Sequence, residues 1–261
     1  MAWARGVAAM VVGVATLVCG LQPHRLAHAE TIRIAAMERW PPYSSPELPN
    51  NGFSTQIVQT AFERAGYATE VVVVPWSRGF DGVMNGAFDA LPNTWYRKSR
   101  LDRIYYTKPH GKTKTVFASR KSDAFYFQDI SDINDKTIAL IQDYNYPDYI
   151  SENQAITEVR TTSLRASLRM LAAGRVDLAL GDQVAMKFQL RNKLKDFKSD
   201  IRIGQQSVKT EPIYVAISKK TANHREIAKA FNRQLEALKA SGAYDRIMAE
   251  HGYPTYMSIR R

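Results

Sequence analysis

Residues 54–91 read STQIVQTAFERAGYATEVVVVPWSRGFDGVMNGAFDAL, and they decide the fold class. Apolar side chains recur at helical spacing from Ile57 onward, and Gly66 ends the run as a C-terminal cap. The β-branched run Glu70–Val74 predicts a buried strand, which Pro75 ends. A helix is therefore followed directly by a strand, and the pattern then starts again.

The rest of the chain repeats this alternation. Ser77 and Ser163 are the expected N-caps of two helices, and Gly86 and Gly174 end them. The other expected elements are strands 31–36, 88–91, 137–141, 176–180 and 212–218 and helices 183–190, 224–241 and 244–251. Such alternation predicts α/β architecture, and its division into two similar blocks predicts two α/β lobes. Ligands of such folds bind beyond the carboxyl ends of the strands or between domains, so we expect a site in the cleft between the lobes.

The first residues predict export. Arg5 precedes the apolar run Gly6–Leu21, and Ala27-His28-Ala29 has the small-x-small pattern of a signal-peptidase site. The run is short for a membrane span, so we expect a signal peptide at 1–29, cleavage after Ala29 and a periplasmic protein. A retained N-terminal anchor and a lipoprotein modified at Cys19 are the alternatives. Cleavage would also remove the sequence's one cysteine, and with it any disulfide or thiolate ligand.

The chain is basic, with a formal net charge of +11 that falls to +9 without the two arginines of residues 1–29. The basic residues are scattered and form no long run, which favours solubility over anionic ligands or an anionic membrane surface as the reason for the charge. We expect no nucleic-acid partner. Catalytic signatures are missing too. The histidines beyond residue 29 are His110, His224 and His251, and they lack metal-ligand spacing. We expect a monomer with no cofactor, no metal and no enzymatic activity.

Two stretches carry candidate binding residues. Trp76 lies between a strand end and a helix start, where it either faces a ligand or packs inside a lobe. The segment 89–107, DALPNTWYRKSRLDRIYYT, holds three arginines at positions 97, 100 and 103. A guanidinium there would clamp a carboxylate through two parallel hydrogen bonds, while any one of the three is equally explained as a solvated surface residue.

Several short motifs, in order, resemble the bacterial extracellular solute-binding proteins of family 3. They are Trp40-Pro41-Pro42-Tyr43, Gly86-Ala87-Phe88-Asp89-Ala90, Arg100 seven residues before Thr107, Tyr106-Thr107-Lys108-Pro109, Leu171-Ala172-Ala173-Gly174-Arg175-Val176-Asp177, and Ser241-Gly242-Ala243-Tyr244. The resemblance covers residues 31–253. It implies a type II periplasmic-binding-protein fold whose two lobes close around a small polar ligand, an amino acid or a related compound, and present it to an inner-membrane ABC permease.

The resemblance also implies site residues. Arg100 would hold a ligand carboxylate and Asp182 an ammonium, and the other expected contacts are Trp40, Trp76, Asn93, Thr94, Tyr144 and Asn145. Two departures from the family pattern leave alternatives open. The segment before Arg100 is one residue short, so Arg97 is the alternative clamp. Asp143-Tyr144-Asn145 stands where family members carry carboxylate donors, and Asp143 either adds negative charge to the cleft or caps a helix.

The resemblance places lobe 1 at 31–116 plus 217–261 and lobe 2 at 117–216, joined by extended segments near 115–119 and 213–218. Two other functions remain compatible with the sequence. One is an enzyme of the cyclohexadienyl dehydratase kind, which would need a general acid or base in the cleft, where Glu38 and Asp182 are the candidates. The other is a ligand-dependent sensor partner.

Overall fold

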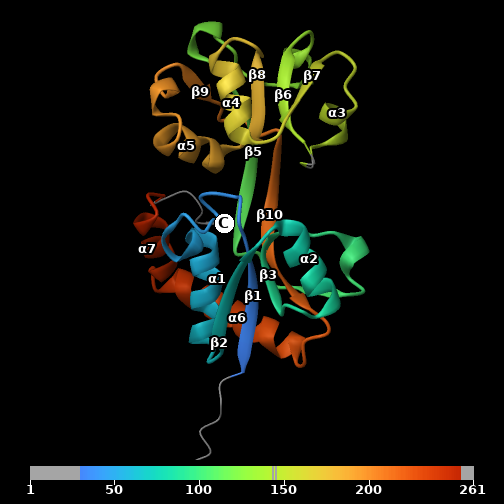
Figure 1. Ribbon diagram of the computed structural model, residues 1–261, viewed down its shortest axis with the longest axis vertical. Helices are drawn as coiled ribbons and strands as arrows, with labels where there is room; N and C mark the ends of the chain where they lie inside the picture. Colours follow the sequence, from blue (N-terminus) through green and yellow to red (C-terminus); the bar gives the residue numbers. More distant parts are fainter. Residues whose placement is uncertain (1–29, 143, 145, 254–261) are drawn as a thin grey trace, which may run out of the picture.

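The computed structural model describes residues 30–142, 144 and 146–253 (Figure 1). Its strands are β1 Thr31–Met37, β2 Ala68–Val74, β3 Ala90–Thr94, β4 Ile104–Tyr106, β5 Gly111–Arg120, β6 Thr137–Ile141, β7 Thr157–Thr161, β8 Leu178–Asp182, β9 Ile201–Ile203 and β10 Lys209–Ser218. Its helices are α1 Phe53–Arg64, α2 Trp76–Asn85, α3 Asp148–Ser151, α4 Leu164–Ala172, α5 Gln183–Asn192, α6 His224–Ala240 and α7 Ala243–Glu250.

The strands follow the order β2-β1-β3-β10-β5-β8-β6-β7, with β4 paired to β10 and β9 paired to β5. Figure 1 shows two α/β bodies joined at a narrow waist by β5 and β10. We call the body with β1–β4, α1, α2, α6 and α7 lobe 1, and the body with β6–β9 and α3–α5 lobe 2. Parallel pairs lie at the two ends of this order, β2 with β1 in lobe 1 and β6 with β7 in lobe 2. This is the two-lobed α/β fold that the alternation predicted.

Each lobe has its own apolar core. Buried side chains of β1, α1, α6 and α7 pack together in lobe 1, and those of β6, β8, α4 and α5 pack in lobe 2. Val184, at the start of α5, is the exception because it is fully buried within the lobe 1 cluster. The beginning of α5 therefore packs on lobe 1, which brings the two lobes into direct contact beside the waist.

Some expected boundaries were wrong. Ser77 is not an N-cap, because α2 already begins at Trp76 and Pro75 occupies the cap position without a side-chain hydrogen bond. Proline is tolerated at a helix start because its missing N–H is not needed there. The third strand extends to Thr94, since β3 keeps pairing with β10 up to Tyr214. By contrast, the expected cap at Ser163 is confirmed, as its hydroxyl accepts from the Ala166 N–H at 3.2 Å.

Within the described ranges, no helix has the length and apolar character needed to cross a membrane. The same part of the chain holds no group of three or more His, Cys, Asp or Glu side chains placed to bind a metal ion.

Candidate functional site

A cavity of about 510 Å³ lies between the lobes. Lobe 1 supplies most of its wall from the ends of β1 and β3, the start of α2 and the turn that follows β3, and lobe 2 supplies Tyr144. The lining residues are Met37, Arg39, Trp40, Trp76, Asn93, Thr94, Trp95, Arg97, Arg100 and Tyr144. Parallel strands β1 and β3 both end here, so the cavity occupies the sheet edge where α/β folds bind ligands.

Arg100 stands on an aromatic stack in this cavity. Trp76 and Phe80, one turn apart on α2, are stacked with ring centroids 5.0 Å apart. The Arg100 guanidinium carbon lies 4.5 Å from the Phe80 centroid and 5.8 Å from that of Trp76. A guanidinium is attracted to aromatic faces, so this stack fixes its plane. Within the described part of the chain, the Arg100 guanidinium makes no ion pair and donates no hydrogen bond.

Arg97 lies in the same wall but is already paired. Its Nη1 lies 3.2 Å from Oε1 of Glu211 on β10, and it also donates to the carbonyl of Tyr96 at 2.8 Å. Glu211 in turn has Lys209 at 3.1 Å. Of the two arginines that the sequence left as candidates, Arg100 therefore keeps its hydrogen-bonding fork available, while Arg97 is held by the waist strand.

Asn93 and Thr94 are buried at the end of β3. Asn93 has a positive φ of 65°, a conformation that asparagine tolerates better than most residues. The Ser54 hydroxyl donates to its Oδ1, whereas its buried Nδ2 has no partner among the described residues. The Thr94 hydroxyl donates to the Tyr214 carbonyl at 3.0 Å. Asn93 thus brings an unused N–H donor to the cavity wall, and Thr94 ties β3 to β10.

Aromatic rings cross the cavity from one lobe to the other. Trp40 and Trp95 of lobe 1 meet edge to face at 6.1 Å, and Trp95 meets Tyr144 of lobe 2 edge to face at 5.5 Å. Burial raises the pKa of Tyr144 well above its usual value, and the charge of Asp182 raises it further. The Thr115 hydroxyl lies close to the Tyr144 hydroxyl and opposes this rise in pKa. Even so, no described group has hydrogen-bonding geometry to the Tyr144 hydroxyl. Tyr144 therefore remains a protonated donor.

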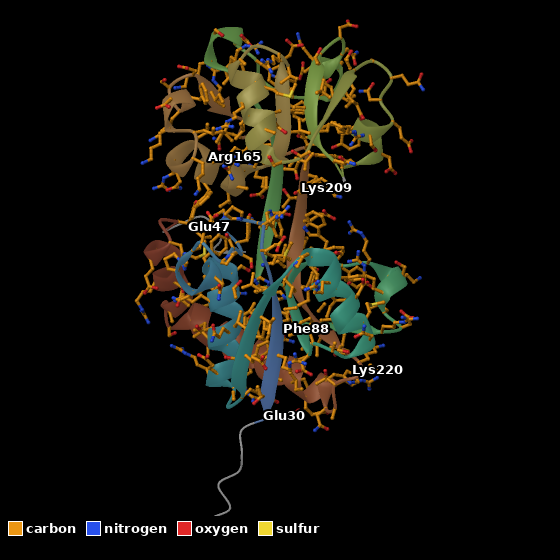
Figure 2. All side chains as sticks on the ribbon, in the orientation of Figure 1. Glu30, Glu47, Phe88, Arg165, Lys209 and Lys220 are labelled. Carbon is orange, nitrogen blue, oxygen red and sulfur yellow. The ribbon has the colours of Figure 1, made fainter. Side chains whose placement is uncertain are left out.

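Asp182 does not line this cavity. It lies in an adjoining one of about 400 Å³, which shares Arg39, Trp40 and Tyr144 with the first. Figure 2 labels Glu47 of lobe 1 and Arg165 of lobe 2, which border this second cavity from opposite sides. Asp182 is the last residue of β8 and the N-cap of α5, with 2% of its surface exposed.

The oxygens of Asp182 are bonded within the protein. Oδ1 accepts from the Ala185 N–H at 2.8 Å, and Oδ2 accepts from the Lys114 N–H at 3.2 Å. The Tyr43 hydroxyl of lobe 1 lies 3.1 Å from both oxygens. Burial raises the pKa of Asp182 to about 6, and these hydrogen bonds oppose the rise. Asp182 thus joins lobe 2 to lobe 1 through Tyr43.

Six of the expected site residues come together in the first cavity: Arg100, Trp40, Trp76, Asn93, Thr94 and Tyr144. Asp182 borders the neighbouring cavity, and Asn145 and Asp143 lie outside the described residues. Sequence reasoning missed Trp95, although it directly follows Asn93 and Thr94, and missed Tyr43 as the partner of Asp182. Trp95 was accessible to the same argument as its neighbours, because it directly follows the end of β3.

A family model described as bacterial extracellular solute-binding proteins, family 3, matches residues 32–253. The chain belongs to this family. Its fold is that of the type II periplasmic binding proteins, as the structural neighbours below show. No curated protein matches the sequence.

Three solved structures illustrate the shared fold. A histidine kinase sensor domain similar to periplasmic binding proteins has a TM-score of 0.68 and 22% identity, covering 85% of this chain and 96% of its own. An ancestral arginine-binding protein bound to arginine has a TM-score of 0.67 and 16% identity, covering 85% and 98%. The unliganded, open L-cystine solute receptor of Neisseria gonorrhoeae has 0.68 and 16%, covering 88% and 95%. At these identities the likeness concerns the fold alone.

Proposed function

We propose that this family 3 protein captures a small polar ligand, an amino acid or a related compound, in the cavity between its lobes and does not transform it. The observation that carries the proposal is the Arg100 guanidinium, which stands unpaired on the Trp76–Phe80 stack in a cavity of about 510 Å³. A planar guanidinium held this way matches a carboxylate with two parallel, charge-assisted hydrogen bonds. Tyr144 and Trp40, from opposite lobes, would cover the ligand.

Hinge closure is the proposed motion. Residues 31–116 plus 217–261 and residues 117–216 would move as two lobes about β5 and β10, which pair with each other at Gly111–Thr115 and Lys209–Ile213. A ligand that touches Arg100 on lobe 1 and Tyr144 on lobe 2 binds the closed state better than an open one, and so favours closure. The family membership supports delivery of the closed form to an inner-membrane ABC permease.

Export to the periplasm is part of the proposal. The sequence pattern of residues 1–29 supports cleavage after Ala29, and the matching family is described as extracellular. N-terminal sequencing of the protein recovered from the periplasm tests this, and a mature chain that starts at Glu30 is expected. A ligand-dependent sensor partner is the second candidate, favoured by the similarity to a histidine kinase sensor domain. Genes for a permease and an ATPase beside this one would support transport.

A thermal-shift screen against a metabolite library tests ligand capture. A compound that binds only the folded protein increases the free energy of unfolding, by about 2.7 kcal/mol when the compound is present at a hundred times its dissociation constant. The melting temperature rises as a result. We expect hits among carboxylates, and we expect none of these hits to raise the melting temperature of Arg100→Gln. A screen without any hit would contradict the proposed function. Chemical change of a hit during incubation would contradict the claim that the protein only binds.

A further inference from the structure

The cleft offers unpaired groups to a negatively charged part of a ligand but none to a positively charged part. This difference limits the class of ligand that can bind. We propose that the cavity is built for an organic carboxylate that has an apolar body and lacks an ammonium group. The inference rests on the proposed function and selects the related organic acid over the amino acid itself.

No acidic side chain lines the cavity that holds Arg100, as far as the described residues go. The three carboxylates that border the adjoining cavity are Glu38, Glu47 and Asp182. Glu38 lies 3.0 Å from the Arg39 guanidinium, and Glu47 lies 3.1 Å from the ammonium of Lys193. Both are therefore neutralised by a cation of the protein.

Asp182 is the family's ammonium partner by position, but its lone pairs are engaged here. A carboxylate has about four lone-pair sites. Two backbone N–H groups and the Tyr43 hydroxyl donate to Asp182 at distances of 2.8 to 3.2 Å, and the residue is 2% exposed. A ligand ammonium would have to displace the Tyr43 hydroxyl, which itself is fully buried. Asp182 therefore joins the two lobes and is not available to a ligand ammonium.

One positive group and two hydrogen-bond donors, by contrast, are left without partners. Of the three arginines that line the cavity, Arg39 is paired with Glu38 and Arg97 with Glu211, whereas Arg100 has no ion-pair partner in the described chain. The Asn93 Nδ2 and the Tyr144 hydroxyl are buried there without a hydrogen-bond partner among the described residues. Buried donors without acceptors are costly, so these two groups and Arg100 together call for a ligand rich in acceptor oxygens.

The aromatic walls do not offer a substitute site for an ammonium. Trp76 already carries the Arg100 guanidinium, and Trp95 has the Arg97 guanidinium 6.0 Å from its centroid. One face of Trp40 is covered by Tyr43, whose ring is stacked on it at 4.6 Å. A second cation over these rings would meet a like charge nearby, which cancels the cation–π attraction. An uncharged ring or chain fits between the tryptophans without this conflict.

Calorimetric titration with matched compounds tests the inference. One series is 3-phenylpropionate, L-phenylalanine and phenethylamine, which share a body and carry the carboxylate alone, both groups, or the ammonium alone. The second series is pentanoate, L-norvaline and butylamine. We expect 3-phenylpropionate to bind at least about tenfold more tightly than L-phenylalanine, because burial of an unpaired charge is unfavourable. The same order is expected in the aliphatic series, and no detectable heat from either amine.

Three results would overturn the inference: tighter binding of L-phenylalanine than of 3-phenylpropionate, binding of phenethylamine, or no binding of either desamino acid. The first two leave the proposed function intact, since a ligand is still captured. If neither desamino acid binds, the metabolite screen shows whether the proposed function fails as well. That function is contradicted only if no compound in the screen stabilises the protein. Arg100→Gln with 3-phenylpropionate is the matched control, and we expect its affinity to be at least about a hundredfold weaker.

Discussion

Figure 1 places α5 and α2 on opposite sides of the waist. On the α5 side, hydrogen bonds and an ion pair join the two lobes directly, whereas the aromatic cavity that holds Arg100 lies on the α2 side. The α5 side has the Tyr43–Asp182 hydrogen bonds, the Glu47–Lys193 ion pair and a hydrogen bond from Arg191 to the Gly252 carbonyl at 3.0 Å. The α2 side has Arg100 and a set of unused donors.

One cleft thus serves two purposes, contact between the lobes and ligand binding. The acidic side chains on the α5 side have partners within the protein, so this side supports contact between the lobes without a ligand. On the α2 side the Arg100 guanidinium and two buried donors lack partners among the described residues, so a ligand must supply the acceptors. Buried donors that lack acceptors are disfavoured unless something supplies the acceptor. The comparison therefore predicts that substitutions on the α2 side change binding and that substitutions on the α5 side change stability.

Arg100→Gln should have the largest effect on binding. It removes the charged fork and leaves a shorter, uncharged polar side chain, so the free energy of ligand binding should weaken by about 3 kcal/mol or more. Stability should change little because Arg100 makes no ion pair with the described residues. Titration calorimetry and a thermal melt measure the two quantities. Arg97→Gln is the control, and its smaller loss of affinity follows from the pairing of Arg97 with Glu211. Equal losses for both variants would remove the distinction between the arginines.

The pH dependence of stability should reveal the buried Asp182 carboxyl. Burial raises its pKa to about 6, above the usual value of about 3.9 for an unfolded chain. The folded state therefore binds more protons than the unfolded state between these values. The contribution of Asp182 to the free energy of unfolding is greatest below pH 4 and is lost as the pH rises through 6.

Asp182→Asn removes this titration. The free energy of unfolding of the variant, relative to wild type, should rise by about 2–3 kcal/mol between pH 4 and pH 7. Urea unfolding at each pH measures it, and Asp81→Asn, on the exposed part of α2, controls for the substitution itself. A difference between Asp182→Asn and wild type that stays constant across this range would contradict the assignment.

Tyr43→Phe should lower stability by about 1.5–2 kcal/mol, since it removes a donor from a buried, charged acceptor and leaves the ring stacking in place. Tyr244→Phe is the matched control. Tyr244 is also buried, but its hydroxyl donates to the neutral His110 carbonyl at 2.9 Å within lobe 1, so we expect a loss of about 1 kcal/mol. Denaturant unfolding compares the two. If Tyr43→Phe loses no more stability than Tyr244→Phe, the hydrogen bond between the lobes contributes no more than an ordinary buried hydrogen bond, which contradicts the prediction.

The Glu47–Lys193 pair should have the smallest effect. The two side chains are 72% and 43% exposed, and exposed pairs contribute about 0–1 kcal/mol. A double-mutant cycle with Glu47→Ala and Lys193→Ala should give a coupling energy below about 0.5 kcal/mol that falls with added salt. A coupling above 1 kcal/mol would mean that the α5 side is held by its surface charges and not by its buried hydrogen bonds.

The sequence predicted the fold well because periodicity and caps are local signals. The helix that ends at Gly66 and the strand that ends at Pro75 needed only neighbouring residues to be recognised. Arg100, Trp40 and Trp76 were found through their order along the chain. The partners of Asp182 were not predictable in this way, because Tyr43 lies 139 residues away and meets it only when the lobes pack. The pairing of Arg97 with Glu211, 114 residues apart, was hidden for the same reason.

Tryptophan fluorescence tests the central claim most directly. The sequence has four tryptophans, and the three beyond residue 29, Trp40, Trp76 and Trp95, all line the Arg100 cavity. Titration of the exported protein with 3-phenylpropionate should give a saturable change in emission whose midpoint matches the calorimetric dissociation constant, and Arg100→Gln should abolish it. Calorimetric binding that leaves the emission unchanged, or an emission change of equal midpoint in Arg100→Gln, would contradict a ligand site built on Arg100.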